Sequence, residues 1–138
     1  MLETSMPLKV QVWICTKTEV LLLRTTSERN SIWQPVTGHV EGEESFHKAA
    51  FRELIEETGL NHAPAVNPLD MHFTFEARGK KFEEEVFYSL IHRSDEITLD
   101  PKEHVDFKWM SFDEAEKQIP FDAQKEAIKK LQTVLKGK

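Results

Sequence analysis

The sequence predicts an α/β fold, an α/β/α sandwich in which a mixed β-sheet lies between helices. Several segments alternate apolar and polar residues, which is typical of strands with one buried face. Two longer segments carry apolar residues at helical spacing. A chain of 138 residues can bury roughly two-thirds of its unfolded surface in one domain. We therefore expect residues 1–138 to form a single domain.

Two strands are expected in the first part of the chain. Apolar and polar side chains alternate from Leu8 to Cys15, which indicates a strand with one buried face. The run Val20–Leu23 is short and continuously apolar, as in a central strand. Polar residues from Thr25 to Ser31 indicate a loop, and residues 33–38 lead from it into the next segment.

That next segment has the pattern of an amphipathic helix from about Ser45 to Thr58. Ser45 suits the N-cap, because its hydroxyl can accept a hydrogen bond from a free N–H of the first turn. Gly59 suits the C-terminal stop, because glycine enters the left-handed conformation without strain.

The second half of the chain continues with strands. Residues 61–68, which include two prolines, are expected to be a connector. Apolar side chains alternate over residues 71–75 and 86–90, and a turn at residues 78–80 would join these strands as a hairpin. A further strand is expected over residues 105–109.

Two helices are expected to end the chain. Ser111 and Glu114 have the spacing of a capping box for a short helix. Apolar residues then recur at helical spacing, which predicts a final amphipathic helix packed on the sheet. These apolar residues are Ala127, Ile128, Leu131 and Leu135.

Three carboxylates occupy an unfavourable place in the first helix. Glu53, Glu56 and Glu57 fall near its C-terminus, on one face, within an arc of roughly 100°. Negative charge there opposes the helix dipole by about 0.3–1 kcal/mol per group. Each like-charged pair adds repulsion of about 0.2–0.5 kcal/mol. A divalent cation would neutralise this cluster, so the pattern indicates a metal site.

Composition limits the classes of function. The net charge of −6 argues against a nonspecific grip on long nucleic acid, although bound Mg2+ can bridge an acidic surface and a polyphosphate. Cys15 is the single cysteine, which excludes an internal disulfide and fits a reducing compartment. The sequence shows no signal-peptide pattern and no apolar run near the roughly 20 residues that cross a bilayer. We expect a soluble, cytoplasmic protein without membrane association.

The carboxylate helix also lies in a longer motif that resembles the signature of the Nudix hydrolases. The motif consists of Gly38, Glu44, Arg52–Leu54, Glu56–Glu57 and Gly59–Leu60, at the spacing of that family. Every fixed position holds a residue of the family type. The resemblance implies the α/β/α sandwich already expected. It also implies an enzyme that uses water to hydrolyse a nucleoside diphosphate linked to another group.

The resemblance implies roles for individual residues. Glu56 and Glu57 would be metal ligands, and Glu53 a ligand or the base that deprotonates water. Arg52 would orient the carboxylates, and the Gly38 carbonyl would be a further ligand. The metal would be Mg2+, for which Mn2+ can substitute, because Mg2+ prefers a few carboxylates together with substrate phosphates.

One metal ligand is expected from outside the helix. Glu103, which precedes Trp109 by six residues, occupies a matching place in MutT-like members of the family. The alternative interpretation is that Glu103 is a solvated loop residue. Glu76 and the run Glu83–Glu85 are rival candidates, although a charge run beside a turn is usually a solvated surface.

Five residues are expected to bind substrate. Arg24 ends the second strand, where family members often hold a phosphate, although an ordinary surface charge explains it equally well. Trp33 would stack on a base or pteridine ring, or else pack in the core, and Gln34 would read a polar edge of that ring. Phe75 and Tyr88 are weaker pocket candidates, for which the core is the alternative.

The motif departs from the usual family pattern at two places. Val36–Gly38 replaces the common Pro-Gly-Gly, and together with Gln34 it resembles dihydroneopterin triphosphate and (d)NTP pyrophosphohydrolases of the MutT type. Residues 103–109 strengthen that similarity. Glu43 stands where the family usually has glycine, and Gly42 lies one place earlier, so we expect the loop to be rearranged.

The expected activity is Mg2+-dependent cleavage of a nucleotide or nucleotide-like triphosphate to a monophosphate and pyrophosphate. One alternative is removal of phosphates from RNA 5′ ends in a basic groove, for which the candidate residues are Arg24, Arg29, Lys80 and Lys81. Nucleoside diphosphate sugars and dinucleoside polyphosphates are alternative substrates. A nucleotide sensor without activity is disfavoured because the helix glutamates are complete. The protein is expected to be a monomer or homodimer.

Overall fold

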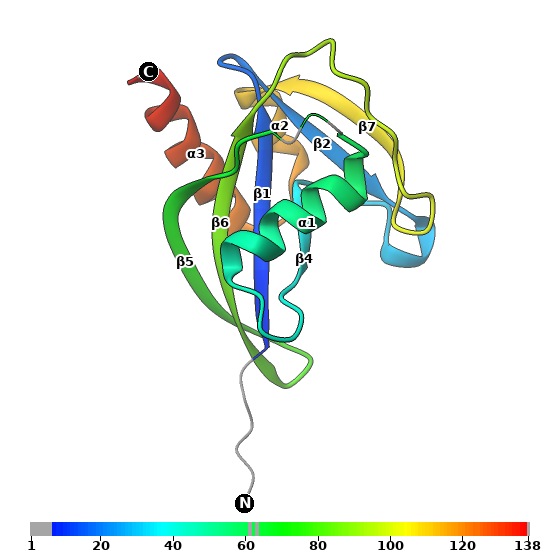
Figure 1. Cartoon of the computed structure of the whole chain (residues 1–138), viewed down its shortest axis with the longest axis vertical. Helices are drawn as coiled ribbons and strands as arrows, with labels where there is room; N and C mark the ends of the chain where they lie inside the picture. Colours follow the sequence, from blue (N-terminus) through cyan, green and yellow to red (C-terminus); the bar gives the residue numbers. More distant parts are fainter. Residues whose placement is uncertain (1–6, 61, 63, 138) are drawn as a thin grey trace, which may run out of the picture.

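The computed structural model describes residues 7–60, 62 and 64–137. These residues form groups of strands separated by a helix, with two helices after the last strand (Figure 1). In chain order they are β1 (Leu8–Cys15), β2 (Glu19–Thr25), the 3-10 turn η1 (Ser27–Arg29), β3 (Trp33–Gln34), β4 (Val36–His39), α1 (Phe46–Thr58), β5 (Asn67–Ala77), β6 (Lys80–Leu90), β7 (His104–Ser111), α2 (Phe112–Gln118) and α3 (Asp122–Lys136).

Strand β1 is the centre of one mixed sheet. It pairs in parallel with β6 along its whole length, from Leu8 opposite Glu83 to Cys15 opposite Leu90. Its other edge pairs antiparallel with β4 near the start of the strand and with β2 near its end. β5 pairs with β6, while β3 and β7 pair with β2, all antiparallel. The mixed sheet expected from the sequence is therefore confirmed.

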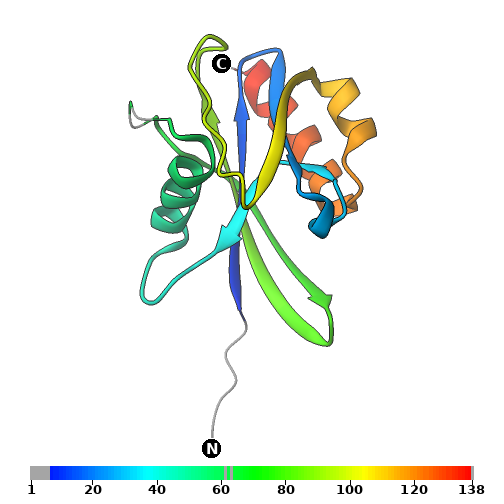
Figure 2. The ribbon, with the colours of Figure 1, turned by 90° about the vertical axis from the view of Figure 1, so that its right-hand side faces the viewer.

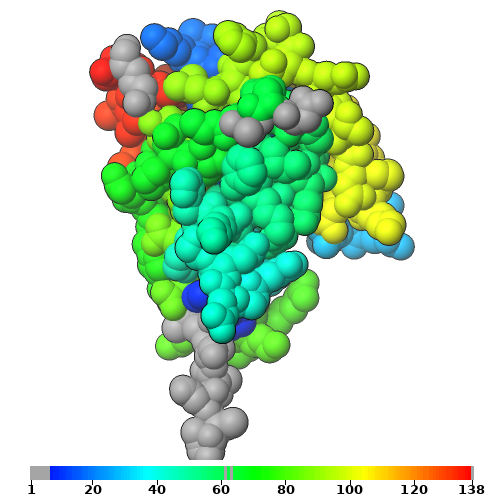
Figure 3. All heavy atoms as spheres, in the orientation of Figure 1, coloured from blue at the N-terminus to red at the C-terminus, as the bar shows by residue number. Residues whose placement is uncertain are grey.

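Helices cover both faces of the sheet, which confirms the predicted α/β/α sandwich. Figure 2 shows α1 on one side of the sheet and α2 with α3 on the other. Alternate side chains of β1 point to opposite faces of the sheet. Val10 and Val12 pack under α1, whereas Trp13 and Cys15 pack under α3. In the space-filling view α1 and its adjoining loops cover their face of the sheet (Figure 3).

The helix ends agree with the sequence. The Ser45 hydroxyl accepts a hydrogen bond from the Lys48 N–H at 3.1 Å, and Gly59 closes α1 in the left-handed conformation at φ 67°. The Ser111 hydroxyl accepts one from the Glu114 N–H at 3.1 Å at the start of α2. The apolar stripe predicted for the last helix is fully buried in α3.

The structure differs from the expectations in four segments. Strand β1, expected to have one buried face, is buried on both faces, because α1 covers one side of it and α3 the other. Residues 33–38 were expected only as a lead-in. They contribute to the short strands β3 and β4, because β2 and β1 supply the hydrogen-bond partners. The polar loop before them contains η1. The expected connector ends early, since Pro68 lies inside β5 at an irregularity in the pairing with β6. Two of its residues, 61 and 63, lie outside the described residues.

None of the helices in the described part of the chain has the length and apolar character needed to cross a bilayer.

Cys15 offers a test of the packing between the sheet and α3. Its side chain is fully buried, and burial raises the pKa of the thiol to about 12. Because the thiolate is the reactive form, we expect native protein to resist iodoacetamide at pH 8 and to react fully in denaturant. Mass spectrometry measures the modified fraction. Rapid modification of the native chain would contradict the packing described here.

Candidate active site

Four carboxylates gather at one end of a cavity of about 880 Å3. Glu53, Glu56 and Glu57 come from the last turns of α1, and Glu103 comes from the turn before β7. The side chain of Glu56 is 56% exposed and that of Glu53 is 13% exposed. The Glu57 side chain is 4% exposed. The structure thus brings together the four carboxylates that the sequence nominated.

Glu57 is a buried acid, and one of its carboxyl oxygens lacks a hydrogen-bond partner among the described residues. Burial is the largest cause that holds the pKa of its carboxyl far above the usual range, and the hydrogen bond and charge of Glu53 raise it further. The charge of Glu103 adds to this shift, and Arg29 opposes it. The Oε1 atom of Glu57 is buried and has no hydrogen-bond partner among the described residues. Protonation of Glu57 or a bound cation would neutralise the buried negative charge.

His104 lies beside Glu57 but does not neutralise it. Its Nδ1 is 3.6 Å from Glu57 Oε1, which is too long for a hydrogen bond, and Nδ1 has no partner in the described part of the chain. Burial lowers the pKa of His104, so the ring is neutral near pH 7. The Gln34 amide contacts His104 Nε2 at 3.4 Å, a weak contact. His104 therefore supplies neither a hydrogen bond nor a positive charge to the buried carboxyl of Glu57.

Arg52 holds the base of the carboxylate cluster. Its guanidinium donates two hydrogen bonds to Glu44, at 2.7 and 3.0 Å, and one to the His39 carbonyl at 2.9 Å. It also donates to Glu53 at 3.1 Å and to Glu56 at 3.3 Å. Hydrogen bonding to Arg52 lowers the pKa of Glu44 to about 2. Arg52 therefore ties the loop before α1, the end of β4 and two cluster carboxylates together.

Gly38 permits the close approach of β4 to α1. A Cβ atom placed on Gly38 would overlap the carboxyl group of Glu53. Any other residue here would displace Glu53 or separate the strand from the helix. In the preceding loop Gly42 has φ 53°, so the left-handed position falls on Gly42 and Glu43 avoids it, as the shifted glycine in the sequence suggested.

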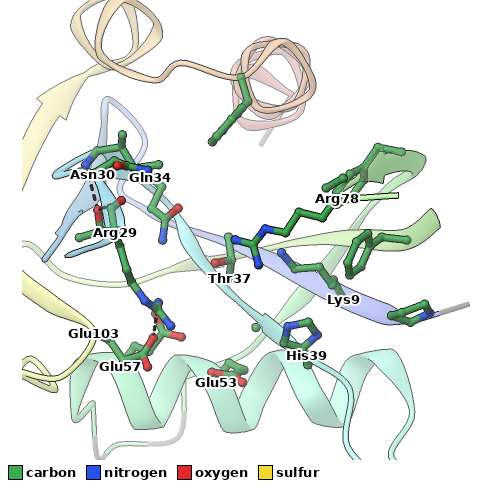
Figure 4. Close-up of a pocket in the computed structure, with 18 of the residues that line it drawn as sticks. Lys9, Arg29, Asn30, Gln34, Thr37, His39, Glu53, Glu57, Arg78 and Glu103 are labelled. Carbon is green, nitrogen blue, oxygen red and sulfur yellow. Dashed lines mark hydrogen bonds and ion pairs between the residues drawn. The ribbon is translucent and has the colours of Figure 1, made fainter. Parts of the chain in front are cut away.

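Glu103 is paired across the cavity end with a cation. Arg29, from η1, donates a hydrogen bond to Glu103 at 2.7 Å. Both side chains line the cavity, and Figure 4 shows them beside Glu57. This ion pair ties Glu103 to η1 at the edge of the cavity, where the Glu103 side chain is 35% exposed.

The donor set fits a divalent cation of the Mg2+ type. Carboxylate oxygens are the preferred protein ligands of Mg2+, which leaves its remaining positions to water and phosphate. The unpartnered buried Oε1 of Glu57 is an oxygen of this kind. No three acidic, imidazole or thiol groups among the described residues are already gathered as a complete ligand set. Glu53 and Glu56 form ion pairs with Arg52, and Glu103 forms one with Arg29.

The five expected substrate-binding residues separate into two groups. Gln34 and Phe75 line the cavity. Trp33 packs against the core under α2 and α3, and the Arg24 guanidinium lies 5.8 Å from the centre of its ring. Tyr88 is 4% exposed and belongs to the same core. In the described structure Arg24, Trp33 and Tyr88 do not line the cavity.

Other cavity residues had not been nominated. They include Lys9, Thr37, His39, Arg78, Phe82 and Phe121. Lys9 and Arg78 are far from the carboxylates in sequence, and only the pairing of β1 with β4 and the reach of the β5–β6 hairpin bring them to the same cavity. Of the basic residues suggested for an RNA groove, Arg29 and Lys80 line the cavity.

Comparison with known proteins agrees with the fold and the carboxylate helix. The family profile described as the NUDIX domain matches residues 7–131. The chain therefore belongs to the NUDIX domain family.

Two curated relatives match parts of the chain. An octanoyltransferase of Myxococcus xanthus is 37% identical over 114 residues, which cover 80% of this chain and 31% of that protein. The m7GpppN-mRNA hydrolase NUDT17 of Danio rerio is 47% identical over 49 residues, which cover 33% of this chain and 16% of that protein. The matched parts thus span less than a third of either relative.

Solved structures share the fold over almost the whole chain. A C. elegans Ap4A hydrolase in a binary complex superposes with a TM-score of 0.83 at 24% identity, covering 96% of this chain and 99% of its own. The E. coli dihydroneopterin triphosphate pyrophosphohydrolase gives 0.80 at 24% identity, with 92% and 95% covered. The MutT protein from Methanosarcina mazei gives 0.77 at 26% identity, with 97% and 98% covered.

A double-mutant cycle tests the contact between Gly38 and Glu53. We expect Gly38→Ala to lower the free energy of unfolding by about 1–3 kcal/mol, because the new methyl group overlaps the Glu53 carboxyl. In a Glu53→Ala background the same change should cost much less. Urea denaturation measures all four proteins. Equal costs in both backgrounds would show that the contact does not constrain the strand.

Proposed function

We propose that the chain is a Mg2+-dependent pyrophosphohydrolase that cleaves a nucleotide or nucleotide-like triphosphate to a monophosphate and pyrophosphate. The observation that carries this proposal is the buried, unpartnered carboxyl oxygen of Glu57 at the end of a large cavity. Charge burial of this kind is costly unless a cation compensates it. Family membership supports the reaction class. The similarity in fold to a MutT protein and to a dihydroneopterin triphosphate pyrophosphohydrolase supports the substrate class.

Glu53, Glu56, Glu57, Glu103 and the Gly38 carbonyl would hold the metal, with Mn2+ as a substitute. When bound, Mg2+ supplies positive charge to the phosphoryl oxygens and to the departing pyrophosphate. Glu57 suits the role of a fixed ligand, because burial in α1 leaves its side chain little freedom. Glu56 is more exposed and lies beside it in the last turn.

The residues of the chain would do the remaining work. We propose that Glu53 accepts the proton of the attacking water, since it lines the cavity between Gly38 and Glu57. The water oxygen bonds to phosphorus, the phosphoanhydride bond breaks, and its electron pair leaves with pyrophosphate. Arg52 keeps Glu53 and Glu56 in place through its hydrogen bonds, and its pKa is raised by Glu44, so it stays charged. Gln34 and Phe75 would contact the ring system of the substrate.

Dinucleoside polyphosphates and RNA 5′ ends are the alternative substrates. The likeness in fold to an Ap4A hydrolase favours the first, and the partial match to an mRNA hydrolase favours the second. Arg29 and Lys80 on the cavity wall would serve either substrate. We propose a single cytoplasmic domain acting as a monomer or homodimer.

A substrate panel tests the activity. Purified protein with Mg2+ is offered NTPs, dNTPs, dihydroneopterin triphosphate, dinucleoside polyphosphates and 5′-triphosphorylated RNA, with pyrophosphate and phosphate as readouts. We expect pyrophosphate release from a triphosphate, lost in EDTA and restored by Mg2+. Absence of release from every compound in the panel would refute the proposed function.

A single substitution separates catalysis from folding. We expect Glu57→Gln to lower kcat at least about 100-fold, because a neutral amide is a poor ligand for Mg2+. Thermal stability without metal should stay equal or rise slightly, because the amide removes a buried acid beside Glu53. Glu126→Gln, on the exposed side of α3, is the matched control and should change neither quantity. Full activity in Glu57→Gln, or a large fall in its Tm, would contradict this role.

A further inference from the structure

The end of the cavity away from the carboxylates is positively charged. Lys9 of β1, Arg78 of the β5–β6 turn and Lys80 of β6 line this end. Figure 4 shows the side chains of Lys9 and Arg78 directed into the cavity, toward Thr37 and across from Glu53 and Glu57. One cavity therefore has an acidic end and a basic end.

The cations of the basic end form no direct ion pair. No carboxylate of residues 7–60, 62 and 64–137 is within ion-pair distance of Lys9 or Arg78, and Glu84 on the neighbouring strand β6 acts on Lys9 only through its charge. Arg29, which also lines the cavity, is by contrast paired with Glu103. In a chain with net charge −6, carboxylates outnumber basic groups. Two cations that point into one cavity repel each other, and an anion bound between them would offset that repulsion.

Local packing holds both cations toward the cavity. The Lys9 ammonium lies 5.8 Å from the ring centres of both Phe75 and Phe82, which stack with each other at 5.2 Å. These rings support the lysine stem and leave its charge on the cavity side. Arg78 has φ 54°, the left-handed conformation that closes the hairpin turn.

The two ends are close enough to hold one substrate. Lys9 is paired with His39, and Val10 with Gly38, which lies against Glu53. Lys9 therefore lies on the strand next to β4, one residue before Val10, the partner of Gly38. Gly38 is the residue of β4 that contacts Glu53 of α1. Neighbouring strands lie about 4.8 Å apart, so a phosphate chain held at the carboxylates reaches the basic end within a few bonds.

We propose that Lys9 and Arg78 form a second phosphate-binding subsite, which holds the phosphates of the substrate that the carboxylate cluster does not. This inference rests on the proposed function, because it assumes that the carboxylate end takes the scissile phosphoanhydride. The bound group is a phosphate oxyanion. It belongs either to the terminal phosphates of a triphosphate or to the distal phosphates of a dinucleoside polyphosphate.

Binding of inorganic tripolyphosphate in EDTA tests the subsite independently of catalysis. Calorimetry compares the wild type with Lys9→Gln and Arg78→Gln. We expect each substitution to weaken binding about tenfold, the loss of one charge-assisted hydrogen bond. Lys81→Gln is the matched control, because Lys81 lies on the same hairpin but does not line the cavity, and it should bind within about twofold of the wild type. No binding by the wild type, unchanged binding in both variants, or an equal loss in the control would overturn the proposal.

Kinetics then identify the source of the phosphate and separate the two proposals. A higher KM for a triphosphate in Arg78→Gln, with weaker inhibition by pyrophosphate, supports the terminal phosphates. A higher KM for a dinucleoside tetraphosphate alone supports the distal phosphates. If the wild type cleaves no substrate but tripolyphosphate binding still depends on Lys9 and Arg78, the subsite stands and the proposed function fails. If the wild type cleaves substrate and KM is unchanged in both variants, the function stands and the subsite fails.

Discussion

The burial of Glu57 at the end of α1 is the constraint on which the site depends. The carboxyl lies beside Glu53, near Glu103, with one oxygen unpartnered and with only a neutral histidine next to it. The helix dipole and the neighbouring carboxylates both disfavour a negative charge on Glu57. The arrangement persists because the apolar side of α1 is anchored under β1 and β4, which makes the position of the carboxylates a consequence of core packing. A bound cation would offset the free-energy cost of this buried carboxylate.

Arg52 connects this unfavourable cluster to the rest of the fold. Its guanidinium reaches the loop before α1 through Glu44, the end of β4 through the His39 carbonyl, and the cluster itself through Glu53 and Glu56. A lysine could not make these contacts together, because only the planar guanidinium offers five donors in a fixed fork. The same geometry explains Gly38, since β4 must approach Glu53 more closely than a side chain allows. Strand, loop and helix are therefore held in one register at the acidic end.

The separation of charge within the cavity gives the site a direction. Carboxylates gather where α1 meets β7. Lys9 and Arg78, which form no direct ion pair with the residues that the structure describes, lie where β1 meets the β5–β6 hairpin. A metal at the first end and a phosphate at the second would align a polyphosphate between them, with the stacked rings of Phe75 and Phe82 at its side. The net charge of the chain conceals this arrangement, because a sum over all residues contains no information about where each charge lies.

The sequence alone determined the features that depend on neighbours along the chain. Helix α1 with its Ser45 and Gly59 ends and the capped start of α2 follow from local hydrogen bonding and periodicity. The motif from Gly38 to Leu60 carried the family and five of the proposed site residues. Only the tertiary structure decided which distant residues meet. The ion pair of Arg29 with Glu103, the burial of Tyr88, and the entry of Lys9 and Arg78 into the cavity depend on strand pairing between segments far apart in the chain. That pairing is set by long-range packing of the sheet, which no local pattern encodes.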